Sequence, residues 1–125
     1  MPKKVLICED DKLIAENLFD KLKRRGYEPF IILIEDGDCM KCCIEGCVEN
    51  TALREQPDCM IVDGLNGLYD CAAEAARRAK PGITPIVFAA NEDLIRAARE
   101  KGYAAFQKPD PTEMFKFIAS YNRLD

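Results

Sequence analysis

Short apolar runs alternate along the chain with longer stretches in which apolar residues recur every three or four positions. The short runs are bounded by charged residues or turn residues, and their length favours buried strands over helices. They predict strands at residues 5–8, 30–34, 59–62, 86–89 and 104–107. The periodic stretches predict helices at residues 11–25, 38–55, 70–79, 91–101 and from 112 onwards, the second of them interrupted at Gly46.

This alternation predicts an α/β fold. Strands that are apolar almost throughout are typical of a parallel sheet with helices on both faces. Right-handed crossovers then produce an open, doubly wound sheet. The 125 residues suffice for one domain, which we expect to span residues 1–125. Ligands of such folds bind beyond the carboxyl ends of the strands, so the residues that follow each strand are the first candidates for a site.

Charge and composition limit the classes of function. The net charge is −4 and the chain has no histidine, so none of its own residues can supply an imidazole base, ligand or phosphoacceptor. Nucleic acids and anionic membranes bind basic surfaces, and neither is expected as the main partner. No apolar run approaches the ~20 residues of a membrane span. Acids follow too soon after Met1 for a signal peptide, which predicts a cytoplasmic protein.

Acidic residues follow two of the predicted strands, and a lysine follows a third. Glu9, Asp10 and Asp11 come after the first strand, Asp63 after the third, and Lys108 after the fifth. If these strands are neighbours, the acids meet in one pocket with the lysine at its rim. Clustered carboxylates favour a hard cation such as Mg²⁺, and a cation, a carboxylate and an ammonium group together favour phosphoryl chemistry. Taken singly, each acid is more typical of a solvated loop.

The order and spacing of these residues resemble a known family. The stretches that carry the resemblance are residues 5–11, 57–63 followed by Asp70, 85–88, and Lys108 with Pro109. Together they resemble the receiver domain of two-component response regulators, and the resemblance covers the whole chain in order. It implies a flavodoxin-like fold, a five-stranded parallel sheet with strand order 2-1-3-4-5.

The resemblance also implies roles for individual residues. Asp63 would be the phosphoacceptor, and Lys108, joined to Pro109 by a cis peptide bond, would pair with the phosphoryl group. The ligands of Mg²⁺ would be Glu9, Asp10, Asp63 and the backbone carbonyl of Leu65. The phosphodonor would be a histidine kinase or a histidine phosphotransfer protein. The chain would not be an enzyme beyond gaining and losing its own phosphoryl group.

Several positions depart from the pattern of that family. The Thr or Ser expected at the end of the fourth strand is Ala90, so the hydroxyl that normally binds the phosphoryl group is missing. The switch aromatic expected three residues before the lysine is Ala105, and Phe106 stands one residue late. Gly67 replaces a proline that usually follows the acceptor, which predicts a more mobile loop. We therefore single out Ala90, Phe106 and Pro109 as switch positions and expect a weakened switch with a remodelled output surface.

Four of the seven cysteines fall in one stretch of nine residues in the second predicted helix: Cys39, Cys42, Cys43 and Cys47. Three of them recur at every fourth position and share one helix face, so we expect small apolar residues that pack the helix onto the sheet. A zinc or iron–sulfur site is the alternative, although the spacing lacks two separated cysteine pairs. A thiol redox sensor is the third possibility. The remaining cysteines, expected in or near the core, are Cys8, Cys59 and Cys71.

Three functions therefore remain open. The first is a phosphoacceptor module in a phosphorelay that has no output domain of its own and signals through contacts with an unknown downstream protein. The second is a pseudo-receiver, a constitutive docking module whose switch has decayed. The third is a metal or redox sensor built on the cysteines. The acids with Lys108 favour the first, whereas Ala90 and the displaced Phe106 favour the second.

Overall fold

The strands form one parallel sheet. The computed structural model describes residues 3–34 and 40–123. Its strands are β1 (Lys4–Glu9), β2 (Glu28–Leu33), β3 (Cys59–Val62), β4 (Thr84–Ala89) and β5 (Ala104–Gln107). They pair in parallel in the order β2-β1-β3-β4-β5. This confirms the predicted doubly wound α/β fold and its strand order.

A helix follows each strand. The helices are α1 (Lys12–Arg24), α2 (Met40–Glu55), α3 (Tyr69–Ala79), α4 (Glu92–Glu100) and α5 (Thr112–Arg123), with a short 3₁₀ turn, η1 (Leu65–Gly67), before α3. The predicted interruption at Gly46 is wrong, because α2 runs through it. The cost of a glycine inside a helix, ~1 kcal/mol, is small beside the burial of Ile44 and Val48 on either side. No helix in the described part of the chain is long and apolar enough to cross a membrane.

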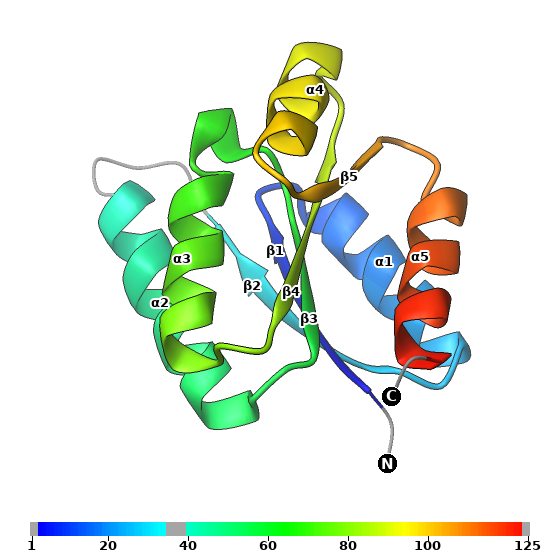
Figure 1. The fold of residues 1–125 in the computed structure, drawn as a ribbon. Coiled ribbons are helices and arrows are strands. Elements are labelled where there is room, and N and C mark those ends of the chain that lie inside the picture. Colours follow the sequence, from blue (N-terminus) through cyan, green and yellow to red (C-terminus); the bar gives the residue numbers. More distant parts are fainter. Residues whose placement is uncertain (1–2, 35–39, 124–125) are drawn as a thin grey trace.

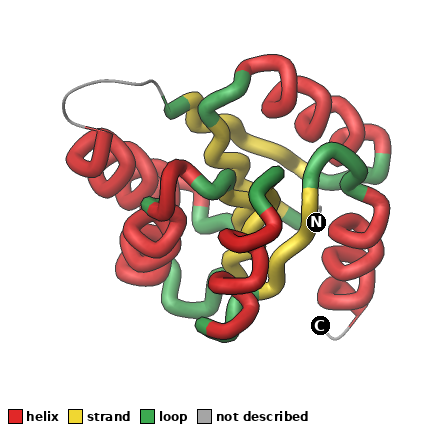
Figure 2. The backbone as a smooth tube through the Cα atoms, turned by 90° about the horizontal axis from the view of Figure 1, so that it is seen from above, coloured by secondary structure: helices red, strands yellow, loops and turns green. Residues whose placement is uncertain are grey.

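The sheet is the middle of three layers. Helices α1 and α5 cover one face, and α2 and α3 cover the other (Figure 1). The view from above shows the strands enclosed between the two helical layers (Figure 2). Alternate residues of a strand point to opposite faces. Ile7 and Phe88 therefore join the core beneath α1 and α5, whereas Cys8 and Val87 join the core shared with α2, α3 and α4.

Polar caps start two helices directly after their strands. Asp11 accepts hydrogen bonds from the backbone N–H groups of Leu13 and Ile14, at 2.9 and 3.2 Å. Asn91 accepts one from Leu94 at 3.1 Å, as its position in the sequence predicts. Such caps satisfy amide groups that have no partner inside the helix. As a result, α1 and α4 both begin at the carboxyl edge of the sheet.

The buried face of α2 differs from the expected one. Ile44, Val48 and Ala52 are fully buried, whereas Cys47 is exposed. The expectation that Cys47 packs onto the sheet is therefore wrong. The buried stripe runs one position further along the helix, a rotation of roughly 100°. Cys39 and the side chains of Cys42 and Cys43 lie outside the described residues. Cys8 and Cys59 are buried and Cys71 is partly buried, as expected.

Candidate functional site

Three carboxylates meet at the carboxyl edge of the sheet. Glu9 ends β1 and is buried, Asp63 follows β3 and is partly buried, and Asp10 is exposed. The ladder of β1 and β3 extends one residue further, because the Asp63 N–H donates to the Cys8 carbonyl at 2.9 Å. This bond fixes Asp63 beside Glu9. Carboxylate oxygens of Glu9, Asp10 and Asp63 lie within 4.8 Å of one another.

Asp11 does not join this cluster. Sequence reasoning grouped it with Glu9 and Asp10, but its carboxylate is engaged as the cap of α1. Of the three consecutive acids, Glu9 and Asp10 therefore belong to the cluster and Asp11 caps α1. A cap requires an acceptor within reach of the second and third amides of the helix, and Asp11 alone of the three stands at that position.

Lys108 closes the cluster from the side of β5. Its N–H donates to the Ala89 carbonyl at 2.9 Å, and its peptide bond to Pro109 is cis, as expected. Its ammonium group lies 3.0 Å from Oε2 of Glu9 and also contacts Oδ1 of Asp63. The side chain of Lys108 is only 10% exposed. The site therefore brings together the four charged residues to which the resemblance gives a role.

The electrostatics of the site follow from burial. Burial is the main cause that raises the pKa of Glu9 to about 7, and the nearby Asp10 and Asp63 act in the same direction. Burial lowers the pKa of Lys108, but its hydrogen bonds to Asp63 and Glu9 outweigh this and hold that pKa above its ordinary value. Lys108 is therefore a fixed cation. Its charge is what keeps Glu9 and Asp63 together in a partly desolvated site.

The turn after Asp63 is held by Asp63 itself. Oδ2 of Asp63 accepts a hydrogen bond from the Leu65 N–H at 3.0 Å. Leu65 has a φ of 49°, in the left-handed region that leucine rarely adopts. Such a conformation costs about 1–2 kcal/mol and needs support from its surroundings. The sequence gives no indication of this left-handed conformation, since a leucine such as Leu65 is an ordinary core residue.

The chain is similar to known regulatory proteins in sequence. No family model matches it. It is 34% identical over 109 residues to the transcriptional regulatory protein PdtaR of Mycobacterium tuberculosis, in a match that covers 85% of this chain and 49% of that protein. The same values hold for that protein from a second strain. The chain thus spans about half the length of the curated relatives it matches.

Solved structures show the same fold. A CheY-like response regulator receiver domain from Methylobacillus flagellatus superposes with a TM-score of 0.70 at 15% identity, over 96% of this chain and 98% of that one. A response regulator from Thermotoga maritima gives 0.69 at 17% identity, over 96% and 99%. The chain has the fold of a response-regulator receiver domain. Together with the sequence match, this confirms the resemblance stated above.

The residues at the expected switch positions lie differently from the pattern of the resembling family. Ala90, directly after β4, is exposed, and its carbonyl accepts a hydrogen bond from Nε2 of Gln107 at 3.1 Å. Phe106 faces α1 and α5, where its ring lies 5.8 Å from that of Phe117. Ala105 faces the opposite side of the sheet. The one-residue displacement therefore puts the aromatic ring on the wrong face for contact with α4.

A cluster that sequence reasoning missed lies on the α4 side of β5. Tyr103, two residues before Ala105, packs edge-on against Tyr69, with 5.6 Å between the ring centres. Lys101 forms an ion pair with Asp70 at 2.6 Å. These contacts fasten the start of β5 to the first turn of α3. Because the partners are more than 30 positions apart, no local pattern in the sequence indicates them.

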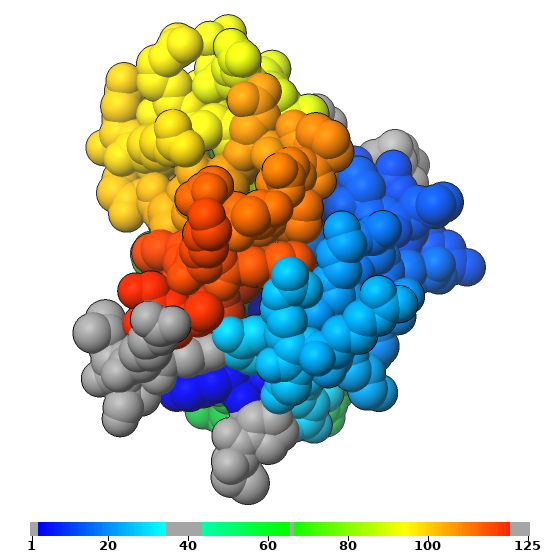
Figure 3. Space-filling model, turned by 90° about the vertical axis from the view of Figure 1, so that its right-hand side faces the viewer, coloured from blue at the N-terminus to red at the C-terminus, as the bar shows by residue number. Residues whose placement is uncertain are grey.

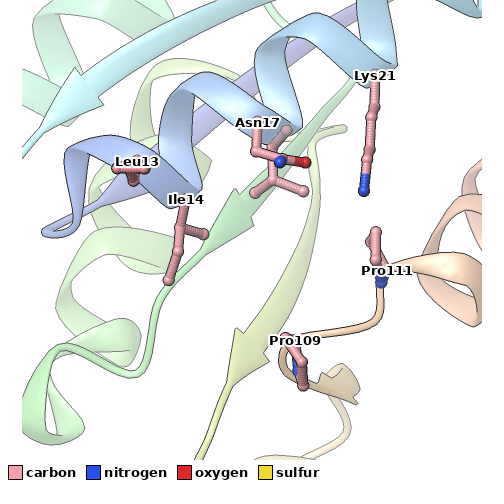
Figure 4. Close-up of a pocket in the computed structure, with 7 residues that line it drawn as sticks. Leu13, Ile14, Asn17, Lys21, Pro109 and Pro111 are labelled. Atoms are coloured by element: carbon pink, nitrogen blue, oxygen red, sulfur yellow. The ribbon is translucent and has the colours of Figure 1, made fainter.

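A groove runs beside the acidic site. It lies between α1 and the segment that follows β5, and Figure 3 shows these two parts side by side on one face of the molecule. The residues that line it are Leu13, Ile14, Asn17, Leu18, Lys21, Pro109 and Pro111 (Figure 4). Leu13 is 72% exposed although it is apolar. The groove adjoins the site, because Pro109 follows Lys108 and Leu13 is held by the cap residue Asp11.

Proposed function

We propose that the chain accepts a phosphoryl group on Asp63 from a phosphohistidine donor and signals its state through protein contacts. The observation that carries this proposal is the contact of one buried ammonium group, Lys108, with both Asp63 and Glu9. A carboxylate next to a fixed cation at an open sheet edge suits in-line attack on phosphorus. A carboxylate that only stabilised the fold would not need to lie at that edge.

The residues of the chain divide the work of the transfer. An oxygen of Asp63 attacks phosphorus, the P–N bond of the donor breaks, and the imidazole nitrogen keeps the bonding electrons and takes up a proton. Lys108 stabilises the negative charge of the phosphoryl oxygens. Glu9 holds Lys108 in place from the other side. The product is an acyl phosphate on Asp63 and a neutral histidine on the donor.

The donor set fits Mg²⁺. Three clustered carboxylates, of which Asp10 is exposed and Asp63 is partly buried, suit a hard cation that keeps some of its waters. Glu9, Asp10, Asp63 and the backbone carbonyl of Leu65 would hold it. When bound, Mg²⁺ supplies charge neutralisation to the transferring phosphoryl group. A response regulator from Burkholderia pseudomallei with the same fold, at a TM-score of 0.63 and 20% identity over 90% of this chain and 64% of that one, is described with a phosphorylated aspartic acid and a calcium ion.

The donor would be a histidine kinase or a histidine phosphotransfer protein in the cytoplasm. None of these 125 residues is a histidine, so none of them can supply the phosphohistidine. The groove beside the site suits such a donor, since a helix of the donor can cover the exposed Leu13 while its histidine reaches Asp63. A downstream protein would then read the phosphorylated state.

A second function, a constitutive docking module, is favoured by one observation. Ala90 offers no hydroxyl to a phosphoryl group, and its carbonyl is tied to Gln107. In that case the surface would bind its partner in the same way with or without phosphate. The two functions differ in whether Asp63 is labelled.

The deciding experiment is intact mass measurement after incubation with Mg²⁺ and a small acyl phosphate. We expect a single phosphoryl adduct, lost on chelation of the metal and absent from Asp63→Asn. Asp70→Asn is the matched control, because Asp70 is also a partly buried acid but lies in an ion pair away from the cluster. If wild type stayed unlabelled under conditions that label another receiver domain, the phosphoacceptor function would be rejected in favour of the docking function.

A further inference from the structure

Leu94 lies directly over the residue that follows the candidate phosphoacceptor. A Cβ atom on Gly64 would stand 2.8 Å from Cδ1 and 3.2 Å from Cδ2 of Leu94. The backbone of Gly64 has φ −57° and ψ −32°, which any residue can adopt. Leu94 therefore occupies the space above Gly64, and a larger residue at position 64 would displace the end of that side chain, whereas the backbone conformation of Gly64 would suit any residue.

The position of Leu94 is set at the rim of the site. Its N–H donates to the cap residue Asn91 at 3.1 Å, and Asn91 directly follows Ala90. The carbonyl of Ala90 is in turn held by Gln107. The first turn of α4 is thus anchored at the edge where the carboxylates meet. From this anchor the side chain of Leu94 reaches back over Gly64 to join the core beneath α4.

The turn beneath Leu94 depends on the state of Asp63. Oδ2 of Asp63 holds the Leu65 N–H at 3.0 Å and so supports the left-handed Leu65. A phosphoryl group or a cation on Asp63 competes for the same carboxylate oxygens. Gly64 lies between these two residues, so a change in the turn changes the space available to Leu94.

We propose that Leu94 is a positioning residue that transmits the state of Asp63 to α4 through its contact with Gly64. The proposal rests on the proposed function, because it requires a change at Asp63. It assigns to a steric contact the coupling that a hydroxyl at position 90 would otherwise provide. A ligand can shift a conformational equilibrium only through contacts that differ between the two states. The contact between Leu94 and Gly64 is one that differs.

The test compares amide NMR shifts with and without beryllofluoride, a phosphoryl mimic, in the presence of Mg²⁺. In wild type we expect shifts at the site and along α4. In Leu94→Ala we expect the shifts of residues 92–100 to fall to less than half, while those around Asp63 persist. Leu94→Met, which keeps a long apolar side chain, is expected to retain them. Leu53→Ala is the matched control, since Leu53 is an exposed leucine on α2, away from the site.

A second pair of variants tests the contact without any ligand. Gly64→Ala pushes Leu94 away, so we expect shifted α4 amides in the unmodified protein. The double variant Gly64→Ala with Leu94→Ala should return them towards wild type, because the shortened side chain no longer meets the added Cβ. This reversal tests the steric contact, and the beryllofluoride response of Leu94→Ala tests whether the contact transmits the state of Asp63. The proposal would be overturned if beryllofluoride shifted the α4 amides of Leu94→Ala as much as those of wild type. It would also be overturned if the double variant showed no reversal. An absence of any beryllofluoride response at Asp63 in wild type would instead count against the proposed function, and the Gly64 variants still decide the contact.

Discussion

The ammonium group of Lys108 lies 3.0 Å from the carboxylate of Glu9, whose side chain is only 2% exposed. Because Lys108 also contacts Asp63, one cation balances two carboxylates in a site that water reaches poorly. Removing one member of a buried charged group leaves the others uncompensated, which costs more than the group contributes when intact. The relationship therefore bears on stability as well as on phosphoryl chemistry.

Replacing Lys108 with methionine should destabilise the protein. We expect the free energy of unfolding to fall by about 3 kcal/mol, because Glu9 remains buried beside Asp63 without a counter-charge. Urea unfolding followed by circular dichroism measures the change. The double variant Lys108→Met with Glu9→Gln should recover part of the loss.

The matched control is Lys116→Met. Lys116 pairs with Glu113 at 3.2 Å, but both side chains are about 70% exposed, at 69% and 72%. A surface pair of this kind contributes at most ~0.5 kcal/mol. Equal losses in Lys108→Met and Lys116→Met would show that the buried contact has no special weight.

Restoring a hydroxyl at position 90 should strengthen the switch. The bond between such a hydroxyl and a phosphoryl oxygen is worth on the order of 1.5–3 kcal/mol, which corresponds to roughly a ten- to hundredfold shift in population. Ala90 is exposed, so threonine fits without crowding the core. We expect Ala90→Thr to enlarge the amide shifts that beryllofluoride produces in α4 and β5. If wild type already shows large shifts there and the threonine adds none, the missing hydroxyl is not what limits the switch.

The groove should matter for protein donors and not for small ones. We expect Leu13→Ala to slow phosphoryl transfer from a histidine-phosphorylated donor domain by about fivefold, equivalent to ~1 kcal/mol of lost contact. Labelling by a small acyl phosphate should proceed at the wild-type rate, because Leu13 does not touch Asp63. Leu53→Ala removes the same kind of side chain from another helix, 55% exposed against 72% for Leu13, and should leave both rates unchanged. Equal slowing with both donors would place the effect of Leu13 in the site itself.

Thiol reactivity should separate the cysteines. Burial is the main cause that raises the pKa of Cys59 to about 12, and the charge of Asp58 adds to it. The thiolate is the reactive form, so the raised pKa keeps Cys59 as the unreactive thiol at pH 8, and burial also blocks access. We expect iodoacetamide to label the exposed Cys47 and to spare Cys59 in the folded protein, as mapped by peptide mass. Rapid labelling of both would mean that this part of the core opens readily.

The raised pKa of Cys59 also makes the stability of the folded protein depend on pH. Because the pKa of Cys59 is higher in the folded state than the model-peptide value of 9.0, folding favours the protonated thiol. Its contribution to stability is complete below pH 9 and is lost as the pH rises towards 12. Cys59→Ser should flatten the pH dependence of the unfolding midpoint over that interval.

The cysteines of α2 are predicted to bind no stoichiometric metal. Cys47 is exposed, whereas Ile44 and Val48 on either side of it are buried, and ligands on one helix encircle a metal poorly. Elemental analysis of protein purified without chelator decides the matter. One equivalent of zinc or iron, lost when Cys39, Cys42, Cys43 and Cys47 are changed to serine, would contradict the prediction.

Alternation of apolar runs with periodic stretches was sufficient to predict a parallel sheet and most of its helices, whereas the strand order came from the family resemblance. The strands are buried on both faces, so each is an unbroken apolar run whose length separates it from a helix. Caps and stops are local as well. Asn91 begins α4 and Gly26 ends α1 with a φ of 88°, and both are visible as residue types. The clustering of Glu9, Asp10, Asp63 and Lys108 was predicted on the condition that the first, third and fifth strands are neighbours. In the structure β4 separates β3 from β5, and the side chain of Lys108 still reaches Glu9 and Asp63.

The pattern of apolar and polar residues could not predict contacts between distant segments of the chain. The face of α2 that is buried depends on how the helix docks, and the difference between Val48 and the exposed Cys47 is a rotation that two similar apolar residues do not specify. Whether Asp11 binds a metal or caps α1 depends on where the helix begins. The approach of Leu94 to Gly64 and the pairing of Tyr69 with Tyr103 arise from segments that pack together on one side of the sheet. Such contacts depend on packing in three dimensions, where residues dozens of positions apart compete for the same space.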